Sequence, residues 1–302
     1  MRSFLIAALL ALQGCAFSQL RDDLGEFYAH PAGVERQVAV EDARVAPLDA
    51  PAFLESFGRK GLWQPVSFIR EKRGGVYLLQ PYDAAKVPVL FIHGAGGTPQ
   101  DWRYFINQLD RSRYQAWAFY YPTGLPVDLS AAWLNDFVTE LHAKYGFSQL
   151  VVAGHSMGGL VARRFIALNA RSGTDYVKLL VTFATPWDGV PMARLGASLG
   201  PYAIPSWRDL VPDSTLLRKV QSESLPPGVQ HHLFYGYRED GTAFDSDGVI
   251  TVASQREANI ERGAAQVHGF RTDHSGILDD AAVFDRFAGV LAGFQLIQTS
   301  SR

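Results

Sequence analysis

The chain is poor in cysteine and in net charge, and each shortage excludes a class of function. A single cysteine in 302 residues rules out an internal disulfide framework and any metal site built from several cysteines. Lys and Arg number 28 against 30 Asp and Glu, so the net charge is −2, and no basic block stands out. Binding of a nucleic acid through its phosphate backbone is therefore not expected.

Long hydrophobic runs are missing as well. After Arg2, residues 4–12 form an uncharged apolar run of about nine residues. A helix needs roughly 20 apolar residues to span a bilayer, so this run is too short to cross one. Its length suits the core of a secretory signal instead.

The single cysteine, Cys15, follows this run closely. Residues 12–15 read Leu-Gln-Gly-Cys and resemble the bacterial lipoprotein box. The resemblance implies that residues 1–14 are a signal peptide and that lipidated Cys15 tethers the protein to a membrane, at about 0.8 kcal/mol per buried methylene. Because Ala16 and not an aspartate comes next, it also implies a cell-envelope location at the outer membrane, facing the periplasm. An ordinary signal peptide with a chance cysteine is the alternative.

Strands and helices alternate along the rest of the chain. Short apolar runs rich in branched residues are typical of strands buried on both faces of a parallel sheet. The alternation predicts one α/β domain over residues 66–302, with a mostly parallel sheet and helices on both faces. In residues 15–65 we expect a tether and a segment packed on the domain edge, with a short helix at 52–57. Strands are expected at residues 76–79, 87–92, 115–121, 150–153, 179–183, 232–237 and 265–268, and helices at 129–141, 161–168 and 281–296.

One junction between a predicted strand and a predicted helix indicates chemistry. Residues 154–159 read Gly-His-Ser-Met-Gly-Gly and follow the apolar strand at 150–153. In so tight a turn, side chains two positions before and after the serine would collide with backbone, which explains the glycines. The turn would expose the hydroxyl of Ser156 at the carboxyl end of the sheet, above a helix N-terminus. A small-residue turn that only lets the helix pack closely is the alternative.

Two glycine motifs carry a resemblance to a known family. Residues 154–159, together with Phe-Ile-His-Gly-Ala-Gly-Gly at 91–97, resemble the α/β-hydrolase superfamily, in particular bacterial triacylglycerol lipases and the related PGAP1-like hydrolases. The resemblance covers residues 87–296 and implies the α/β-hydrolase fold with a small cap insertion. It implies that the backbone N–H groups of Ala95 and Met157 form the oxyanion hole, although a flexible glycine turn without that role is the alternative. His93 is expected to be a structural hydrogen-bonding residue.

A serine hydroxyl needs a histidine to accept its proton and a carboxylate to orient that histidine. This fold supplies them in the chain order Ser, Asp or Glu, His. His274 lies in the polar loop 271–276 before the last predicted helix, where the fold delivers its base, and it is favoured over His268.

Four aspartates are candidates for the acid. Asp247 precedes Gly248 and two apolar residues, and this segment resembles the lipase segment in which an Asp-Gly pair supplies the acid. Asp-Gly is also a common turn. The alternatives are Asp240, Asp245 and Asp188.

The segment after the strand at 179–183 resembles a region beside the active site of these lipases. Residues 184–189 read Ala-Thr-Pro-Trp-Asp-Gly, and the proline-rich residues 190–228 stand where this fold commonly inserts a cap. Its apolar residues could suit a fatty acyl chain or pack onto the domain. They are Met192, Leu195, Leu199, Tyr202, Ile204 and Trp207.

These motifs predict a serine carboxylester hydrolase that acts on lipid-like esters through an acyl-enzyme on Ser156, with His274 as base and Asp247 as orienting acid. The mechanism requires no metal and no organic cofactor. The expected partners are an ester or acyl-lipid substrate and the membrane that holds Cys15. An acyltransferase or thioesterase with the same triad, or a non-catalytic membrane-tethered module, would fit the same sequence.

Overall fold

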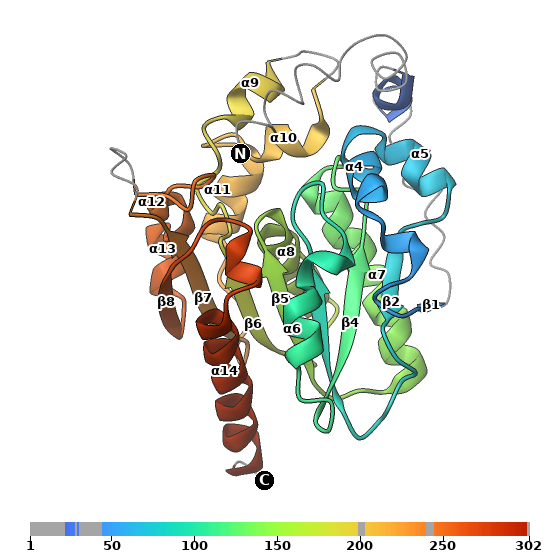
Figure 1. The fold of residues 1–302 in the computed structure, drawn as a ribbon, viewed down its shortest axis with the longest axis vertical. Helices are drawn as coiled ribbons and strands as arrows, with labels where there is room; N and C mark the ends of the chain where they lie inside the picture. The colour runs from blue at the N-terminus through green and yellow to red at the C-terminus, as the bar shows by residue number, and fades with distance from the viewer. Residues whose placement is uncertain (1–21, 28, 30–43, 199–202, 240–244, 301–302) are drawn as a thin grey trace.

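The computed structural model describes residues 22–27, 29, 44–198, 203–239 and 245–300 of the chain (Figure 1). Its centre is an eight-stranded sheet in the order β1-β2-β4-β3-β5-β6-β7-β8. Every neighbouring pair is parallel except β2 with β4. The strands are β1 (Arg44–Val45), β2 (Gly75–Leu78), β3 (Val87–Ile92), β4 (Tyr114–Tyr120), β5 (Leu150–His155), β6 (Val177–Phe183), β7 (Gln230–Tyr237) and β8 (Gln266–Arg271).

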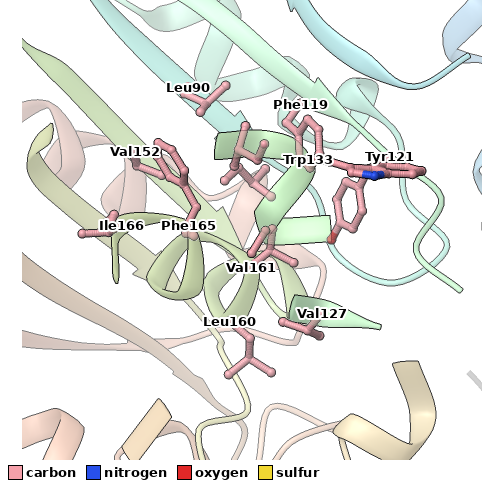
Figure 2. Packing of buried hydrophobic residues seen from close by; sticks show 14 of the residues in the cluster. Leu90, Phe119, Tyr121, Val127, Trp133, Val152, Leu160, Val161, Phe165 and Ile166 are labelled. Carbon is pink, nitrogen blue, oxygen red and sulfur yellow. The ribbon is translucent and has the colours of Figure 1, made fainter. Parts of the chain in front are cut away.

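Alternate residues along the strands enter two core clusters on opposite faces of the sheet. In β3, Leu90 and Ile92 join a cluster with residues of α7 (Val127–Tyr145) and α8 (Met157–Arg171). Val89 and Phe91 join the other cluster, with residues of α6 (Arg103–Gln108) and α14 (Ala281–Ser300). Figure 2 shows residues of the first cluster. Burial on both faces explains why the strands are continuous apolar runs.

Shorter helices occupy the connections between these elements. They are η1 (Pro51–Phe53), α4 (Glu55–Trp63), α5 (Pro65–Arg70), η2 (Pro99–Trp102), α9 (Ala193–Ala197), α10 (Pro205–Asp209), α11 (Thr215–Ser222), α12 (Val252–Gln255), α13 (Ala258–Arg262) and η4 (Gly276–Leu278).

The seven predicted strands correspond to β2–β8, so the expected mostly parallel α/β fold is confirmed. Their limits differ by a few residues, and β8 continues past His268 to Arg271. The sequence does not predict β1, a strand of two residues whose pairing with β2 places Arg44 opposite Tyr77. A strand this short has no alternation to read.

The single helix predicted at 52–57 is wrong. The structure has the 3₁₀-helix η1, which ends at Phe53, and then α4, which begins at Glu55. Leu54 separates them with an extended backbone (ψ 140°), which interrupts the helical hydrogen bonds. The helix predicted at 161–168 begins earlier, because α8 starts at Met157, directly after the Ser156 turn.

The parallel strands β3 and β5–β8 place their carboxyl ends at one edge of the sheet. The loops that follow them carry the predicted site residues, since ligands and catalytic groups in open α/β sheets gather at this edge.

Candidate active site

Ser156 occupies a strained turn between β5 and α8. Its backbone has φ 54° and ψ −129°, a conformation that residues with a side chain rarely adopt. Its N–H donates a hydrogen bond of 2.8 Å to the carbonyl oxygen of Phe183 at the end of β6, which holds the turn in place.

Glycine on either side of Ser156 is a steric requirement. A Cβ on Gly154 would lie 2.7 Å from the carbonyl oxygen of Gly158, and a Cβ on Gly158 would lie 2.6 Å from the carbonyl oxygen of His93. Both separations are below normal van der Waals contact. The close approach of backbone segments that the sequence predicts at this turn is therefore present.

Three predicted side chains form one line of hydrogen bonds. His274 Nε2 lies 3.0 Å from Ser156 Oγ, and His274 Nδ1 lies 2.7 Å from Asp247 Oδ2. The side chain of His274 is 14% exposed, whereas that of Asp247 is fully buried. With Nδ1–H donating to the carboxylate, Nε2 is free to accept the proton of the serine hydroxyl.

The backbone around Asp247 fixes its carboxylate before any substrate arrives. Its Oδ1 accepts hydrogen bonds from the N–H groups of Val249 and Ile250, at 2.8 and 2.7 Å. Its carbonyl oxygen accepts the N–H of His274 at 3.0 Å. The loop that carries the acid and the loop that carries the histidine are thus joined by backbone as well as side-chain bonds.

The alternative residues lie elsewhere or outside the description. Asp188 and Asp245 are exposed to solvent, and Asp240 is not among the described residues. His268 lies within β8, where its ring stacks on His232 at 6.1 Å between centroids. The structure brings Asp247 and His274 to Ser156.

His155 contacts the site, and no sequence pattern predicts a role for it. Its Nε2 donates a hydrogen bond of 2.8 Å to the carbonyl oxygen of His274, and the two rings lie 4.8 Å apart. Burial lowers the pKa of His155 to about 3, so its imidazole is neutral near pH 7. A neutral ring at this place steadies the backbone of His274 without adding a positive charge beside it.

The loop that carries Ala95 is held from the β4–α7 connection. The N–H of Gly96 donates to Thr123 Oγ1 at 2.9 Å, and the hydroxyl of Tyr121 donates to the carbonyl oxygen of His93 at 2.9 Å. These two bonds lie on either side of Ala95. In the part of the chain that the structure describes, no acceptor takes the N–H of Ala95 or that of Met157, so both donors are available to a ligand.

His93 lies in the same loop and is fully buried. Its Nδ1 donates to the carbonyl oxygen of Gly94 at 2.9 Å, and its ring stacks on Tyr121 at 4.7 Å. Burial lowers its pKa to about 4. These contacts fit the structural role expected for it and keep it away from the proton transfer.

Helix α4 packs on the outer side of this loop. A Cβ on Gly58 of α4 would lie 2.6 Å from the carbonyl oxygen of Gly96, so helix and loop are in direct contact. Thr98 is the N-cap of η2 where the loop ends, and Asp101 completes the capping box by accepting the N–H of Thr98 at 3.3 Å. Burial raises the pKa of Asp101 to about 6.

The segment expected to form a cap contains α9, α10 and α11. Ile204 is buried, whereas Met192 and Leu195 are 48% and 66% exposed. Leu199 and Tyr202 lie outside the described residues. A role of this segment over an acyl pocket stays a prediction.

Cys15 and residues 1–14 also lie outside the described residues. No helix in the described ranges is long and apolar enough to cross a membrane. Within those same ranges, no group of three or more His, Cys, Asp or Glu side chains is placed to hold a metal ion.

A serine at a strand-to-helix turn, on the carboxyl edge of a mostly parallel sheet covered by helices, defines an α/β hydrolase by fold. Residues 89–290 match the model of the alpha/beta hydrolase family, and the chain belongs to this family. The resemblance seen in the two glycine motifs is thereby confirmed.

Relatives of known structure or curated name agree with the family. The GPI inositol-deacylase of Candida albicans is 24% identical over 239 residues, which cover 70% of this chain and 53% of that protein, so the chain spans about half the length of this relative. The mature lipase BlEst2 of Bacillus licheniformis is similar in fold, with a TM-score of 0.55 at 20% identity over 72% of this chain and 97% of that one. The lin2722 product of Listeria innocua has a TM-score of 0.50 at 16% identity over 67% and 92% of the two chains.

Proposed function

We propose that the protein is a serine carboxylester hydrolase that acts on lipid-like esters through an acyl-enzyme on Ser156. The observation that carries the proposal is the hydrogen-bonded line from buried Asp247 through His274 to Ser156. Membership of the alpha/beta hydrolase family supports it. The name of the curated relative, an inositol deacylase, favours an acyl ester as the substrate class.

Acylation would begin when Ser156 Oγ attacks the ester carbonyl carbon and its proton passes to His274 Nε2. The carbonyl oxygen then carries negative charge, which the N–H groups of Ala95 and Met157 would stabilise, each donor being worth about 10²- to 10³-fold in rate. Asp247 holds the imidazolium in its orientation. When the tetrahedral intermediate collapses, the bond to the leaving alcohol breaks and the alcohol takes the proton from His274.

Deacylation would repeat these steps with water. His274 takes a proton from the water as its oxygen attacks the acyl carbon, and the returned proton releases Ser156 as the ester bond breaks. Free acid and regenerated enzyme are the products. If an alcohol or thiol competes with water at this stage, the same site performs acyl transfer.

A panel of p-nitrophenyl esters with acyl chains of increasing length tests the function. We expect turnover to rise with chain length, and Ser156→Ala to lower it by at least about 10⁴-fold. Ser148→Ala is the matched control, because Ser148 is exposed and lies before β5 at the opposite edge of the sheet. Unchanged activity in Ser156→Ala contradicts the proposal, and a preference for the shortest esters contradicts its lipid part.

We also propose that Cys15 is lipidated and holds the protein at the outer membrane, facing the periplasm. The Leu-Gln-Gly-Cys sequence and the single cysteine support this. Incorporation of labelled palmitate into the protein, lost in Cys15→Ser, is the expected result. Label retained in Cys15→Ser contradicts it.

A further inference from the structure

The first described residues are docked firmly on α5. Residues 22–27 are helical, and both carboxylate oxygens of Asp23 accept backbone N–H groups at the start of α5, from Val66 and Ser67 at 2.8 Å each. Leu24 is fully buried, and Phe27 enters the core cluster that contains α7 and α8. The point where the chain leaves Asp22 toward Cys15 is therefore fixed relative to the sheet.

Residues 22–27 and α5, which together form this docking point, lie at the end of the sheet where the carboxyl ends of the parallel strands carry the site. Gly75, the first residue of β2, pairs with Tyr120, the last residue of β4, and α5 comes just before β2 in the chain. The ring of Phe68 on α5 packs against Tyr120 at 5.0 Å. Figure 1 shows the dark blue helix of residues 22–27 next to α5 at the upper end, while α14 runs to the lower end.

Side-chain contacts link the docking point to α9. Trp63, the last residue of α4, meets Trp207 of α10 edge to face at 5.3 Å. Gly196 of α9 lies so close to the Trp207 ring that no Cβ would fit there. Helices α4, α9 and α10 are thus in contact, and Figure 1 shows them together with α5 at the upper end of the molecule, where their outward sides form a surface.

Large apolar side chains are exposed on this surface. Met192 and Leu195 are 48% and 66% exposed, and Arg194 between them is also exposed. Apolar side chains beside a basic residue suit the interface of a bilayer, where the apolar groups enter the acyl boundary and the cation meets anionic headgroups.

The length of chain before Asp22 decides which edge of the protein can meet the membrane. Six residues lie between Cys15 and Asp22, and the seven Cα-to-Cα steps that join the two span at most about 25 Å when the chain is fully extended. Strand β7 alone has eight residues and is about 26 Å long. A tether that starts above the carboxyl ends of the strands does not reach past their amino ends.

We propose that the surface formed by α4, α5, α9 and α10 rests on the bilayer that holds the acyl chains of Cys15, with Met192 and Leu195 in the lipid interface. The inference rests on the proposed lipidation and deepens the proposed function. It directs the Ser156 site at esters that reside in that same bilayer, rather than at esters dissolved in the surrounding water.

Site-specific fluorescence on the full-length lipidated protein tests the orientation. Leu195→Cys and Ser148→Cys are each labelled with an environment-sensitive NBD dye after reconstitution into phosphatidylethanolamine–phosphatidylglycerol vesicles. Each variant offers one thiol, because acylated Cys15 is the only other cysteine. The dye at 195 should shift to the blue and be quenched by spin-labelled lipid, and the dye at 148 should do neither. Equal behaviour at both positions overturns the proposal.

Labelling of the unsubstituted chain separates the two proposals from each other. If the dye reacts with that chain, Cys15 carries a free thiol, and the tether and the orientation both fail. Hydrolysis of a soluble ester by the same sample would leave the function of Ser156 standing. If the sample does not hydrolyse the soluble ester but the dyes at positions 195 and 148 behave as expected, the proposed function fails and the proposed orientation on the membrane stands.

A charge substitution gives the matching readout in activity. Leu195→Glu should lower hydrolysis of a long-chain ester embedded in the vesicles about tenfold, because the leucine no longer enters the lipid. It should leave hydrolysis of soluble p-nitrophenyl acetate unchanged. Ser148→Glu, with the same charge at the opposite edge, should change neither rate. A fall in both rates with Leu195→Glu, or in neither, overturns the proposal.

Discussion

Asp247→Asn removes one charge from the proposed triad and changes almost no volume. In the buried carboxylate, Oδ1 accepts hydrogen bonds from the backbone N–H groups of Val249 and Ile250, and Oδ2 accepts one from His274 Nδ1. In the asparagine variant the amide oxygen keeps the two backbone bonds, so its NH₂ group faces Nδ1. The ring must then carry its proton on Nε2, where it cannot accept the proton of Ser156. By analogy with other serine triads we expect kcat to fall about 10⁴-fold, equivalent to about 5.5 kcal/mol.

Steady-state kinetics on p-nitrophenyl butyrate measures this effect. KM should change little, because Asp247 is fully buried behind His274. Asp245→Asn is the control, since Asp245 is exposed and only two residues away. Thermal unfolding of both variants checks that each one is folded. A folded Asp247→Asn enzyme that keeps kcat within tenfold of the wild type would refute the assigned role of this carboxylate.

Three further predictions concern the surroundings of the site and the core. Thr123→Val removes the hydroxyl that accepts the Gly96 N–H and should lower kcat about tenfold, which is less than the loss of an oxyanion donor costs. Thr123→Ser keeps a hydroxyl and should restore the rate. An unchanged kcat in the valine variant would show that this bond does not support the loop. Gly158→Ala should destabilise the protein by a few kcal/mol in urea unfolding, because its Cβ meets the carbonyl oxygens of Ile92 and His93. Gly289→Ala, in open space on α14, should instead stabilise it by about 0.5–1 kcal/mol, and equal effects of the two would contradict the steric reasoning. Burial lowers the pKa of His231 to about 3 in the folded protein, whereas its pKa in the unfolded chain is about 6.5. Between pH 6.5 and pH 3 the unfolded chain therefore binds a proton that the folded protein does not bind, and the free energy of unfolding falls as the pH drops. Between pH 7 and pH 5 this histidine should lower the free energy of unfolding by about 2 kcal/mol. Urea unfolding of His231→Gln should therefore depend on pH less strongly by that amount. The same pH dependence in the variant and the wild type would contradict the assigned effect of His231.

Local signals explain why much of the site could be predicted from the sequence. The serine turn needs glycine at fixed offsets, and Gly154 and Gly158 do lie in van der Waals conflict with any added Cβ. Because the fold supplies its residues in the order Ser, acid, His, the candidates for the catalytic base are the histidines after Ser156. In the structure, His274 is the histidine within hydrogen-bond distance of Ser156 Oγ. Each of these features depends on a few neighbouring residues or on the known order of the fold.

Contacts between distant segments explain what the sequence did not reveal. Thr123 supports the loop of Ala95 through the N–H of Gly96, 27 residues away in the chain, and no pattern around Thr123 indicates this bond. His155 reaches the carbonyl oxygen of His274 across 119 residues. The first bond follows from the way β3 and β4 lie side by side in the sheet, and the second from the way the loop after β8 returns to the end of β5. Periodicity alone determines neither arrangement.

The outermost strand β1 and the neighbouring helix α4 could not be predicted from local patterns either. Strand β1 has two residues and exists only because β2 lies beside it. Helix α4 contains Gly58 and Gly61, which weaken a helical pattern, yet Gly58 is needed for close contact with the backbone of Gly96. Packing against the site loop therefore outweighs local propensity in this segment.

Direct detection of an acyl group on Ser156 is the most direct test of the central claim. The protein is mixed with excess p-nitrophenyl ester, quenched in acid within milliseconds, digested and examined by mass spectrometry. We predict that the peptide spanning β5 and α8 gains the mass of the acyl group on Ser156, and that His274→Ala abolishes this gain. An unmodified Ser156 during active turnover, or an acyl group on another residue, would contradict the account.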